Sequence, residues 1–467
     1  MIENPDRSPL KPYFRWMVLA IMSLICFAQY FIYDSITPLG SLIKSPIGQG
    51  GLGFSGSQYG LLFSAYAVAN VFLLMLLIAG VLVDKLGLKI SGILYGFLCF
   101  LGAALTALGA MAALPRLLGP AYAWLNTAFL PQWSAGLKIM LLGRAVYGVG
   151  AEAILVVNNK VLARWFKGKE LAFAYGMNLT IMRLGTFLAL NVQAPVAKHW
   201  GLRNALWFAA LLMLIGFSTY FIYLWLERKA RGRAGAPIAE RGAGQPEEKF
   251  RLKEIFTFSP SFWFISLLCV TFYSAVFPFQ AYAPDILVQK FGYSVTLAGS
   301  IASALIFGTM IFTPIFGWLV DRFGKRATLM MLGSLLLIPC HLLIGFTYIP
   351  PIIPIFVVGI ALSLVPAALW AAIPMMVPEN RLGTAFGVIG YIQNVGLMLF
   401  PYIAGRISDA HTIYKNVNGE SVAVVDYRST MLMFALLGAV GFVFSVLLKR
   451  ADTRRKEGQS IEAVMKG

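Results

Sequence analysis

Charged residues are scarce in this sequence, and so are the residue types that usually carry catalysis or bind metals. Only 12% of the 467 residues are charged, against about a quarter in an ordinary soluble protein. There are 20 acidic residues, 3 histidines and 4 cysteines, and no His or Cys pair has the spacing of a zinc site. No glycine-rich loop is followed by the Lys-Ser/Thr pair of a phosphate-binding loop. The sequence therefore argues against an enzyme, a bound metal or cofactor, and ATP-driven chemistry.

Apolar residues are correspondingly abundant. They make up 59% of the chain, and the mean hydropathy is +0.75. A helix needs about 20 apolar residues to cross a bilayer. Twelve segments meet this requirement, near residues 16–41, 57–83, 90–113, 136–160, 170–192, 203–226, 259–287, 295–320, 327–347, 351–377, 382–406 and 427–449. The sequence therefore predicts an all-α membrane protein with 12 transmembrane helices, surrounded by lipid.

A polar stretch divides these segments into two sets of six. It reads ERKARGRAGAPIAERGAGQPEEKFRLK and covers residues 227–253. We therefore expect an N-terminal six-helix bundle at 1–226, a linker at 227–258, a C-terminal six-helix bundle at 259–449 and a tail at 450–467.

The excess of basic residues has a topological interpretation. The chain carries 38 Lys and Arg, for a net charge of +18. In a soluble domain this excess would favour nucleic-acid binding. Here most of these residues lie at the N-terminus, in the linker, in the tail and in the loops of one side, as the positive-inside rule describes. We therefore expect both termini to be cytoplasmic, and no nucleic-acid partner.

The two halves share a loop motif. The first copy reads GVLVDKLGLK from Gly80, and the second reads GWLVDRFGKR from Gly317. Both copies follow the second helix of their half and lie on the predicted cytoplasmic side. Same-side copies in halves of six helices indicate a parallel repeat, with its axis along the membrane normal.

The residue types of this motif suit a gate, although a simple topology anchor is the alternative. Glycine allows a tight turn and a close helix approach. The Asp can accept hydrogen bonds from the N-terminal amides of a neighbouring helix, and the basic residues stay near the headgroups. The residues that we expect to act in gating are Gly80, Asp84, Lys85, Gly87, Arg144, Gly317, Asp321, Arg322 and Gly324.

These paired loops and the six-plus-six layout resemble the major facilitator superfamily across essentially the whole chain. RAVYGVG, from Arg144 to Gly150, also resembles the motif of the fourth helix of that superfamily. The resemblance implies two six-helix bundles that rock around a central site.

A few charged residues stand inside the predicted helices, where charge is costly and is usually functional. Glu152 and Arg183 lie at mid-depth in two consecutive antiparallel helices, so they can face one cavity. A zwitterionic substrate needs this arrangement, with its carboxylate on Arg183 and its ammonium on Glu152. Two alternatives remain open, namely a structural salt bridge between the two residues and a proton-coupling role for Glu152.

The other intramembrane charges have plainer interpretations. We expect Arg144 to brace helix packing or gating rather than to bind substrate. Asp34 and Asp285, at the outer ends of the first and seventh helices, act in gating or only as interfacial caps. Polar and aromatic residues at similar depths complete the predicted substrate site, namely Tyr30, Tyr33, Tyr273, Trp370, Gln393 and Asn394.

A closer resemblance is to the MFSD1 branch, the lysosomal dipeptide transporters. It rests on Glu152 and on the segments WFKGKEL from Trp165, MRLG from Met182, ALW ending at Trp370, VPE from Val377, LGTAFG from Leu382 and IQN ending at Asn394. In that branch a glutamate and an arginine engage the peptide termini near a tryptophan. The resemblance assigns these roles to Glu152, Arg183 and Trp370, and implies facilitated dipeptide movement without an obligatory proton gradient.

We therefore expect an alternating-access transporter of dipeptides, acting as a uniporter and a monomer, with an accessory subunit left open. A proton-coupled organic-anion or drug antiporter is one alternative, and a non-transporting sensor or scaffold of the same fold is another. The N-terminus has no acidic dileucine signal, and Asn178-Leu-Thr180 lies inside a predicted helix, where glycosylation is excluded. We therefore expect a prokaryotic inner membrane rather than a lysosome.

Overall fold

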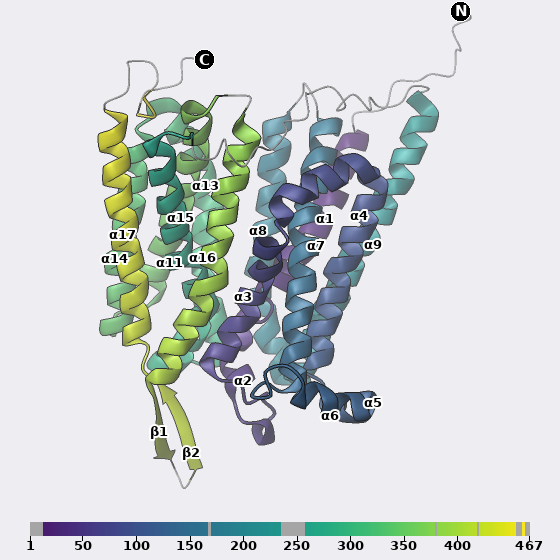
Figure 1. Cartoon of the computed structure of the whole chain (residues 1–467), viewed down its shortest axis with the longest axis vertical. Helices are drawn as coiled ribbons and strands as arrows, with labels where there is room; N and C mark the ends of the chain where they lie inside the picture. The colour runs from purple at the N-terminus through teal and green to yellow at the C-terminus, as the bar shows by residue number, and fades with distance from the viewer. Residues whose placement is uncertain are drawn as a thin grey trace, which may run out of the picture.

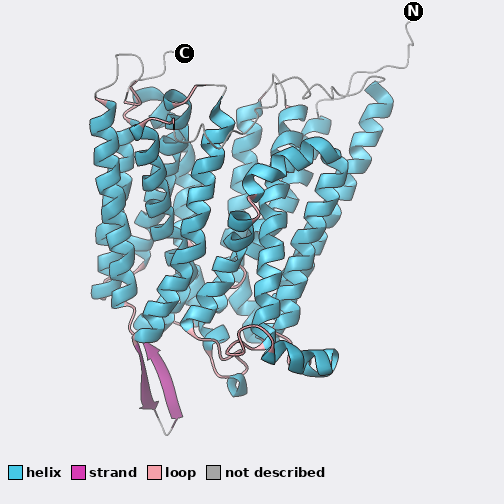
Figure 2. Ribbon diagram, viewed as in Figure 1, coloured by secondary structure: helices cyan, strands magenta, loops and turns pink. Residues whose placement is uncertain are grey.

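The computed structural model describes residues 13–166, 170–234, 257–378, 381–417, 420–453 and 460–462, and these are almost entirely helical (Figure 2). The N-terminal half contains α1 (Tyr13–Asp34), α3 (Gly56–Phe72), α4 (Met75–Gly109), α7 (Ala135–Trp165), α8 (Leu171–Trp200) and α9 (Leu202–Ala234). The C-terminal half contains α11 (Pro260–Phe291), α12 (Val295–Ala302), α13 (Ala304–Phe323), α14 (Arg326–Phe346), α15 (Ile352–Met376), α16 (Leu382–Ala410) and α17 (Arg428–Asp452).

These elements confirm the prediction of 12 transmembrane helices. Ten helices of the described residues are long and apolar enough to span a membrane. The other two crossings are made by α3, which continues into the first turns of α4, and by the more polar α8. The predicted linker is helical at its start, because α9 runs on to Ala234. Its residues 235–256 lie outside the described ranges.

The shared loop motif supplies the turn between the second and third crossings of each half. Gly87 interrupts α4 with φ 73° and ψ 161°, and Gly324 ends α13 with φ 65°. An L-residue with a side chain adopts positive φ only at a cost. This agrees with the expectation that the second glycine of each copy makes a tight turn.

Short elements lie outside the crossings. After α1 the chain forms η1 (Thr37–Leu39), α2 (Gly40–Lys44) and η2 (Ile47–Gln49). The loop before α7 contains α5 (Leu114–Leu118) and α6 (Pro120–Thr127). An antiparallel hairpin of β1 (Thr412–Val417) and β2 (Glu420–Val425) connects α16 to α17.

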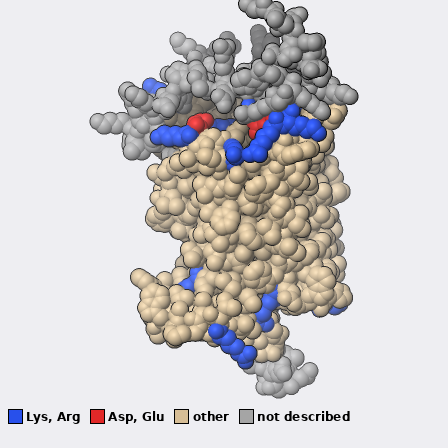
Figure 3. Space-filling view, turned by 90° about the vertical axis from the view of Figure 1, so that its right-hand side faces the viewer, with Lys and Arg blue, Asp and Glu red and all other residues tan. Residues whose placement is uncertain are grey.

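Figure 1 shows two helical bundles side by side, with the start of α1 and the end of α17 at one end of the molecule and the β1–β2 hairpin at the other. We call these the terminal end and the hairpin end. Figure 3 shows a broad belt without charged side chains between them, as expected of a surface in contact with lipid. Large apolar side chains on α9, such as Leu211 and Ile215, are more than half exposed. The molecule is therefore a multi-pass membrane protein.

The two bundles are joined at the hairpin end. There α3 crosses α16 so closely that a Cβ on Gly405 would lie 2.2 Å from the carbonyl oxygen of Gly56. Near the terminal end, by contrast, Gly80 and Gly317 have no atom within 4 Å of an added Cβ. Among the described residues, the hydrogen bonds that connect the bundles also lie at the hairpin end. The structure is thus closed at the hairpin end.

Within the N-terminal bundle, the packing of α1 against α8 depends on Gly185. An added Cβ there would lie 2.3 Å from the carbonyl oxygen of Phe27, whereas one on Gly176 of the same helix would meet nothing within 4 Å. We therefore expect Gly185→Ala to lower the free energy of unfolding by about 1–3 kcal/mol, the usual cost of overpacking. Gly176→Ala should leave it unchanged or slightly raised. Thermal unfolding of the two purified variants tests this, and equal midpoints would contradict it.

Candidate functional site

Glu152 and Arg183 lie on neighbouring helices, α7 and α8, and both are partly exposed. The Glu152 carboxylate accepts a hydrogen bond of 2.8 Å from the Tyr66 hydroxyl of α3. The Arg183 guanidinium lies 5.9 Å from the centre of the Tyr30 ring of α1. Within the described residues, Arg183 has no hydrogen-bond acceptor and no ion-pair partner.

The two charges therefore do not neutralise each other. No salt bridge joins Glu152 to Arg183, so in this state of the protein the described residues do not form the structural ion pair considered from the sequence. Both groups nevertheless lie within electrostatic reach of the Tyr30 phenol. An anion-binding group and a cation-binding group thus both act on one aromatic residue, and each has capacity left for a charged partner.

Aromatic side chains surround the Glu152 carboxylate. The Tyr66 ring packs edge-on against Tyr33, with centroids 4.9 Å apart, and contacts Tyr147 at 5.7 Å. Tyr33 also lies within electrostatic reach of Glu152. Tyr30 therefore lies near Arg183 and Tyr33 near the Glu152–Tyr66 pair, and a role of either in substrate binding stays a prediction.

The C-terminal bundle supplies a second cluster of aromatic side chains. The Trp370 indole of α15 donates a 3.1 Å hydrogen bond to the Tyr273 hydroxyl of α11, and the indole stacks on Phe386 of α16. Tyr273 lies within electrostatic reach of Arg183 and Tyr30. The structure therefore brings Tyr273 and Trp370 to the Arg183 side of the site.

Two predicted binding residues of α16, Gln393 and Asn394, are hydrogen-bonded to other parts of the C-terminal bundle. The Gln393 amide oxygen accepts a weak hydrogen bond from the Cys269 thiol of α11. Asn394 is buried, and its amide nitrogen donates to the Gly390 carbonyl one turn earlier in the same helix. Gln393 remains partly exposed, while Asn394 contributes to packing in this state.

Arg144 of α7 is fully buried and bound to backbone. Its guanidinium donates to the carbonyl oxygens of Leu62, Ile32 and Tyr33, at 3.0, 3.3 and 3.2 Å. It thereby connects α7 to α1 and α3, which agrees with the expected packing brace.

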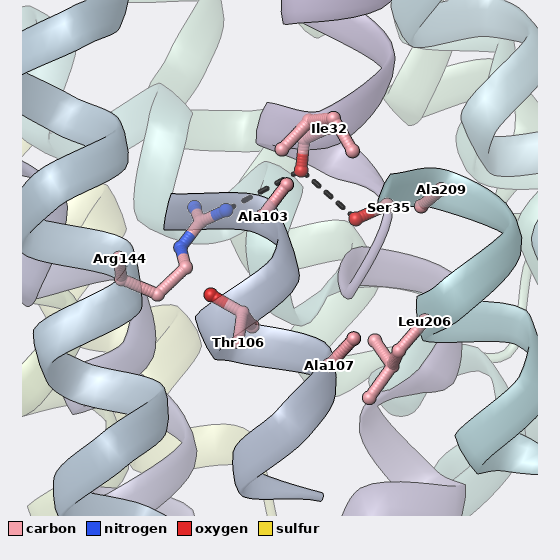
Figure 4. Close-up of a pocket in the computed structure, with 8 residues that line it drawn as sticks. All are labelled: Ile32, Ser35, Ala103, Thr106, Ala107, Arg144, Leu206 and Ala209. Atoms are coloured by element: carbon pink, nitrogen blue, oxygen red, sulfur yellow. Dashed lines mark hydrogen bonds between the residues drawn. The ribbon is translucent and has the colours of Figure 1, made fainter. Parts of the chain in front are cut away.

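Arg144 also borders a small cavity inside the N-terminal bundle. Figure 4 shows its guanidinium directed toward the Ile32 carbonyl, which also accepts a hydrogen bond from Ser35. The remaining lining consists of small and apolar side chains and Thr106. Neither Glu152 nor Arg183 lines this cavity, so it is separate from the charged pair.

Among the described residues, the gating motif makes no hydrogen bond or ion pair across the bundles in this state. Asp84 pairs with Lys160 of α7 at 2.6 Å, within its own bundle. Arg322 lies over the rings of Trp318 and Phe323 of its own helix. Lys85 and Asp321 are exposed. A gating role for these residues therefore stays a prediction.

Sequence reasoning missed Tyr66, the direct partner of Glu152. A polar aromatic residue near the middle of an otherwise apolar segment was the available signal, but depth alone does not identify the helix face. It also missed Asp409 of α16, which accepts hydrogen bonds from the amides of Gly56 and Ser57 in the other bundle. Nothing in the sequence pairs residues so far apart.

The helix order and the shared loop motif together define a secondary transporter fold. The family model of the Major Facilitator Superfamily matches residues 19–289 and 277–464, and the chain belongs to this superfamily of membrane transporters.

Within this superfamily, the chain is similar to particular transporters. The lysosomal dipeptide transporter MFSD1 of Danio rerio is 29% identical over 417 residues, covering 87% of this chain and 83% of the relative. The MFSD1 protein of Homo sapiens is 28% identical over 407 residues, covering 85% and 80%. The inward-facing, unoccupied structure of a bacterial homologue of the human lysosomal transporter Spinster has a TM-score of 0.71 at 16% identity, covering 96% and 100%. This structural likeness concerns the fold alone.

The three bonds of Arg144 yield a stability test. Lysine keeps the charge but lacks the planar fork that reaches three carbonyls, and each buried acceptor left unpaired costs about 1–3 kcal/mol. We expect Arg144→Lys to lower the thermal midpoint clearly. Arg116→Lys, at an exposed position of α5, should leave it unchanged. An unaltered midpoint for Arg144→Lys would show that these bonds do not brace the bundle.

Proposed function

We propose that this protein transports dipeptides by alternating access, facilitatively, and that Glu152 and Arg183 hold the two termini of the substrate. The observation that carries the proposal is that Arg183 has no acceptor among the described residues. A guanidinium in the membrane interior without a counter-ion is expensive. A substrate carboxylate offers it the planar bidentate partner that it lacks.

The other end of the substrate would be held by Glu152. The Tyr66 hydroxyl occupies one oxygen of this carboxylate, which leaves acceptor capacity for an ammonium group. The Tyr30 ring lies within electrostatic reach of both charges, so the backbone of a bound peptide would pass over an aromatic surface. A free amino acid carries the same two charges on one carbon, and we expect it to bind more weakly because it spans a shorter distance.

The C-terminal bundle would take part through Tyr273, which lies within electrostatic reach of Arg183, and through Trp370, which is hydrogen-bonded to Tyr273. A ligand that touches both bundles favours the state in which they are closer together. Binding between the bundles thus supports closure of the terminal end, as alternating access requires.

We further propose that the terminal end faces the cytoplasm, because the basic residues of the two motif loops, such as Lys85, Lys89, Arg322 and Lys325, lie at that end. The structure would then be the inward-facing state. A prokaryotic inner membrane stays our proposal for its location.

Binding to the purified protein tests the substrate class. A ligand that prefers the folded state raises the apparent stability by mass action. We expect free dipeptides to raise the thermal midpoint, whereas N-acetylated or C-amidated dipeptides should not. If only organic anions or lipophilic cations stabilise the protein, the dipeptide proposal fails and an organic-anion or drug antiporter replaces it.

Variants of Glu152 and Arg183, which we call the clamp, test the roles of the individual residues. We expect Arg183→Lys and Glu152→Gln each to weaken dipeptide binding at least about tenfold, since a charge-assisted hydrogen bond contributes about 1.5–3 kcal/mol. Tyr66→Phe should weaken it less, because the carboxylate remains. Arg116→Lys serves as the control, and uptake into proteoliposomes without a pH gradient is the functional readout. Wild-type affinity in Arg183→Lys and Glu152→Gln would exclude the clamp.

A further inference from the structure

The hairpin end contains a carboxylate that connects the two bundles through backbone atoms. Asp409, in the last turn of α16, accepts hydrogen bonds from the amides of Gly56 and Ser57 at 2.6 and 2.9 Å. These amides open α3, at the N-terminus of the helix. The first amides of a helix have no partner within it, and this end of the helix carries the positive end of its dipole.

The amides of this first turn are fully accounted for. Asp409 takes those of Gly56 and Ser57, and the Ser55 side chain takes that of Gln58 in a capping box. Two of these three amides are thus bound by the opposite bundle. When the bundles separate at the hairpin end, α3 must lose this part of its cap.

Glycines bring the two helices within reach of this bond. A Cβ on Gly56 would lie 2.8 Å from the Asp409 carboxylate and 3.1 Å from the Gly405 carbonyl oxygen. A Cβ on Gly60 would lie 2.2 Å from the Pro401 carbonyl oxygen. The Tyr282 hydroxyl of α11 donates to the Gly56 carbonyl at 2.8 Å. The contact therefore exists only while α3 and α16 are in closest approach.

We propose that Asp409 is a gating residue of the hairpin end, whose carboxylate on the N-terminus of α3 stabilises the state closed at that end. The motif residues predicted from the sequence lie at the terminal end, so the contact between Asp409 and α3 is separate from them. The inference rests on the two-bundle movement of the transporter and not on the identity of its substrate.

Other contacts reinforce the same closure. Asp34 accepts a 2.8 Å hydrogen bond from the Gln280 amide of α11. Lys44 of α2 pairs with Asp285 of α11, which also accepts from the Tyr427 hydroxyl. Because these contacts remain in an Asp409 variant, we expect a shift in population rather than permanent opening.

Distances between spin labels measure this shift without substrate. Labels on cysteines at Trp200 and Ile353 report the hairpin end of the two bundles, and labels at Trp225 and Val443 report the terminal half. All four positions are more than half exposed, and the four native cysteines are buried. In Asp409→Asn we expect a longer-distance population at the hairpin end to increase at least threefold, with shorter distances at the terminal end.

A second variant disturbs the same contact sterically and not by removing the charge. Gly56→Ala keeps the Asp409 charge but inserts a methyl group against its carboxylate, so it should shift the same populations. Asp426→Asn and Gly48→Ala are the matched controls, because Asp426 is a partly exposed surface acid and a Cβ on Gly48 meets nothing. Unchanged distances in both test variants would overturn the proposal, whether or not their melting temperatures fall. If Asp409→Asn fails to fold, the distances in Gly56→Ala decide the question.

Discussion

A charged group inside a membrane needs a partner, and this requirement organises the interior of the protein. Arg144 is satisfied by three backbone carbonyls, and Lys44 by Asp285 across the bundle interface. Glu152 has the Tyr66 hydroxyl. Arg183 differs, because its guanidinium has only an aromatic ring beside it in the described part of the chain. A transporter must leave one such group available, since a site whose charges are already paired has no electrostatic reason to bind a zwitterion.

The same requirement bears on the two ends of the molecule. At the hairpin end, Asp34, Asp285 and Asp409 each find a donor in the opposite bundle. At the terminal end, Asp84 finds Lys160 in its own bundle. In this state the carboxylates of the hairpin end are bonded across the bundles, whereas Asp84 at the terminal end is bonded within its own. Because a hydrogen bond exchanged for one to water changes the free energy by only about 0.5–1.5 kcal/mol, contacts of this kind suit an interface that opens and closes.

Much of the fold was predictable because each crossing needs a long apolar segment and each motif glycine a special backbone angle. Glu152 and Arg183 were predicted as site residues because charge is rare in such segments. Other features depend on tertiary contacts. The role of Tyr66 becomes visible only when one knows which face of α3 packs on α7. The role of Asp409 becomes visible only when one knows that α3 and α16 cross. The β1–β2 hairpin had a local signal, since Asn418-Gly419 between alternating residues favours a hairpin turn. The sequence analysis considered only the apolar segments on either side and predicted no hairpin between them.

The position of Asp34 connects the charged pair with the closed gate. It stands one turn beyond Tyr30 on α1, so the two residues share a helix face. Asp34 binds Gln280 of the opposite bundle and lies within electrostatic reach of Arg183. Arg183 has no ion-pair partner in the described part of the chain, and its charge acts on a carboxylate that also bonds across the two bundles. Under the proposed binding mode, a substrate carboxylate on Arg183 would neutralise this charge and weaken its attraction for Asp34. The proposal therefore implies that substrate binding and the Asp34–Gln280 bond at the hairpin end influence each other through Arg183.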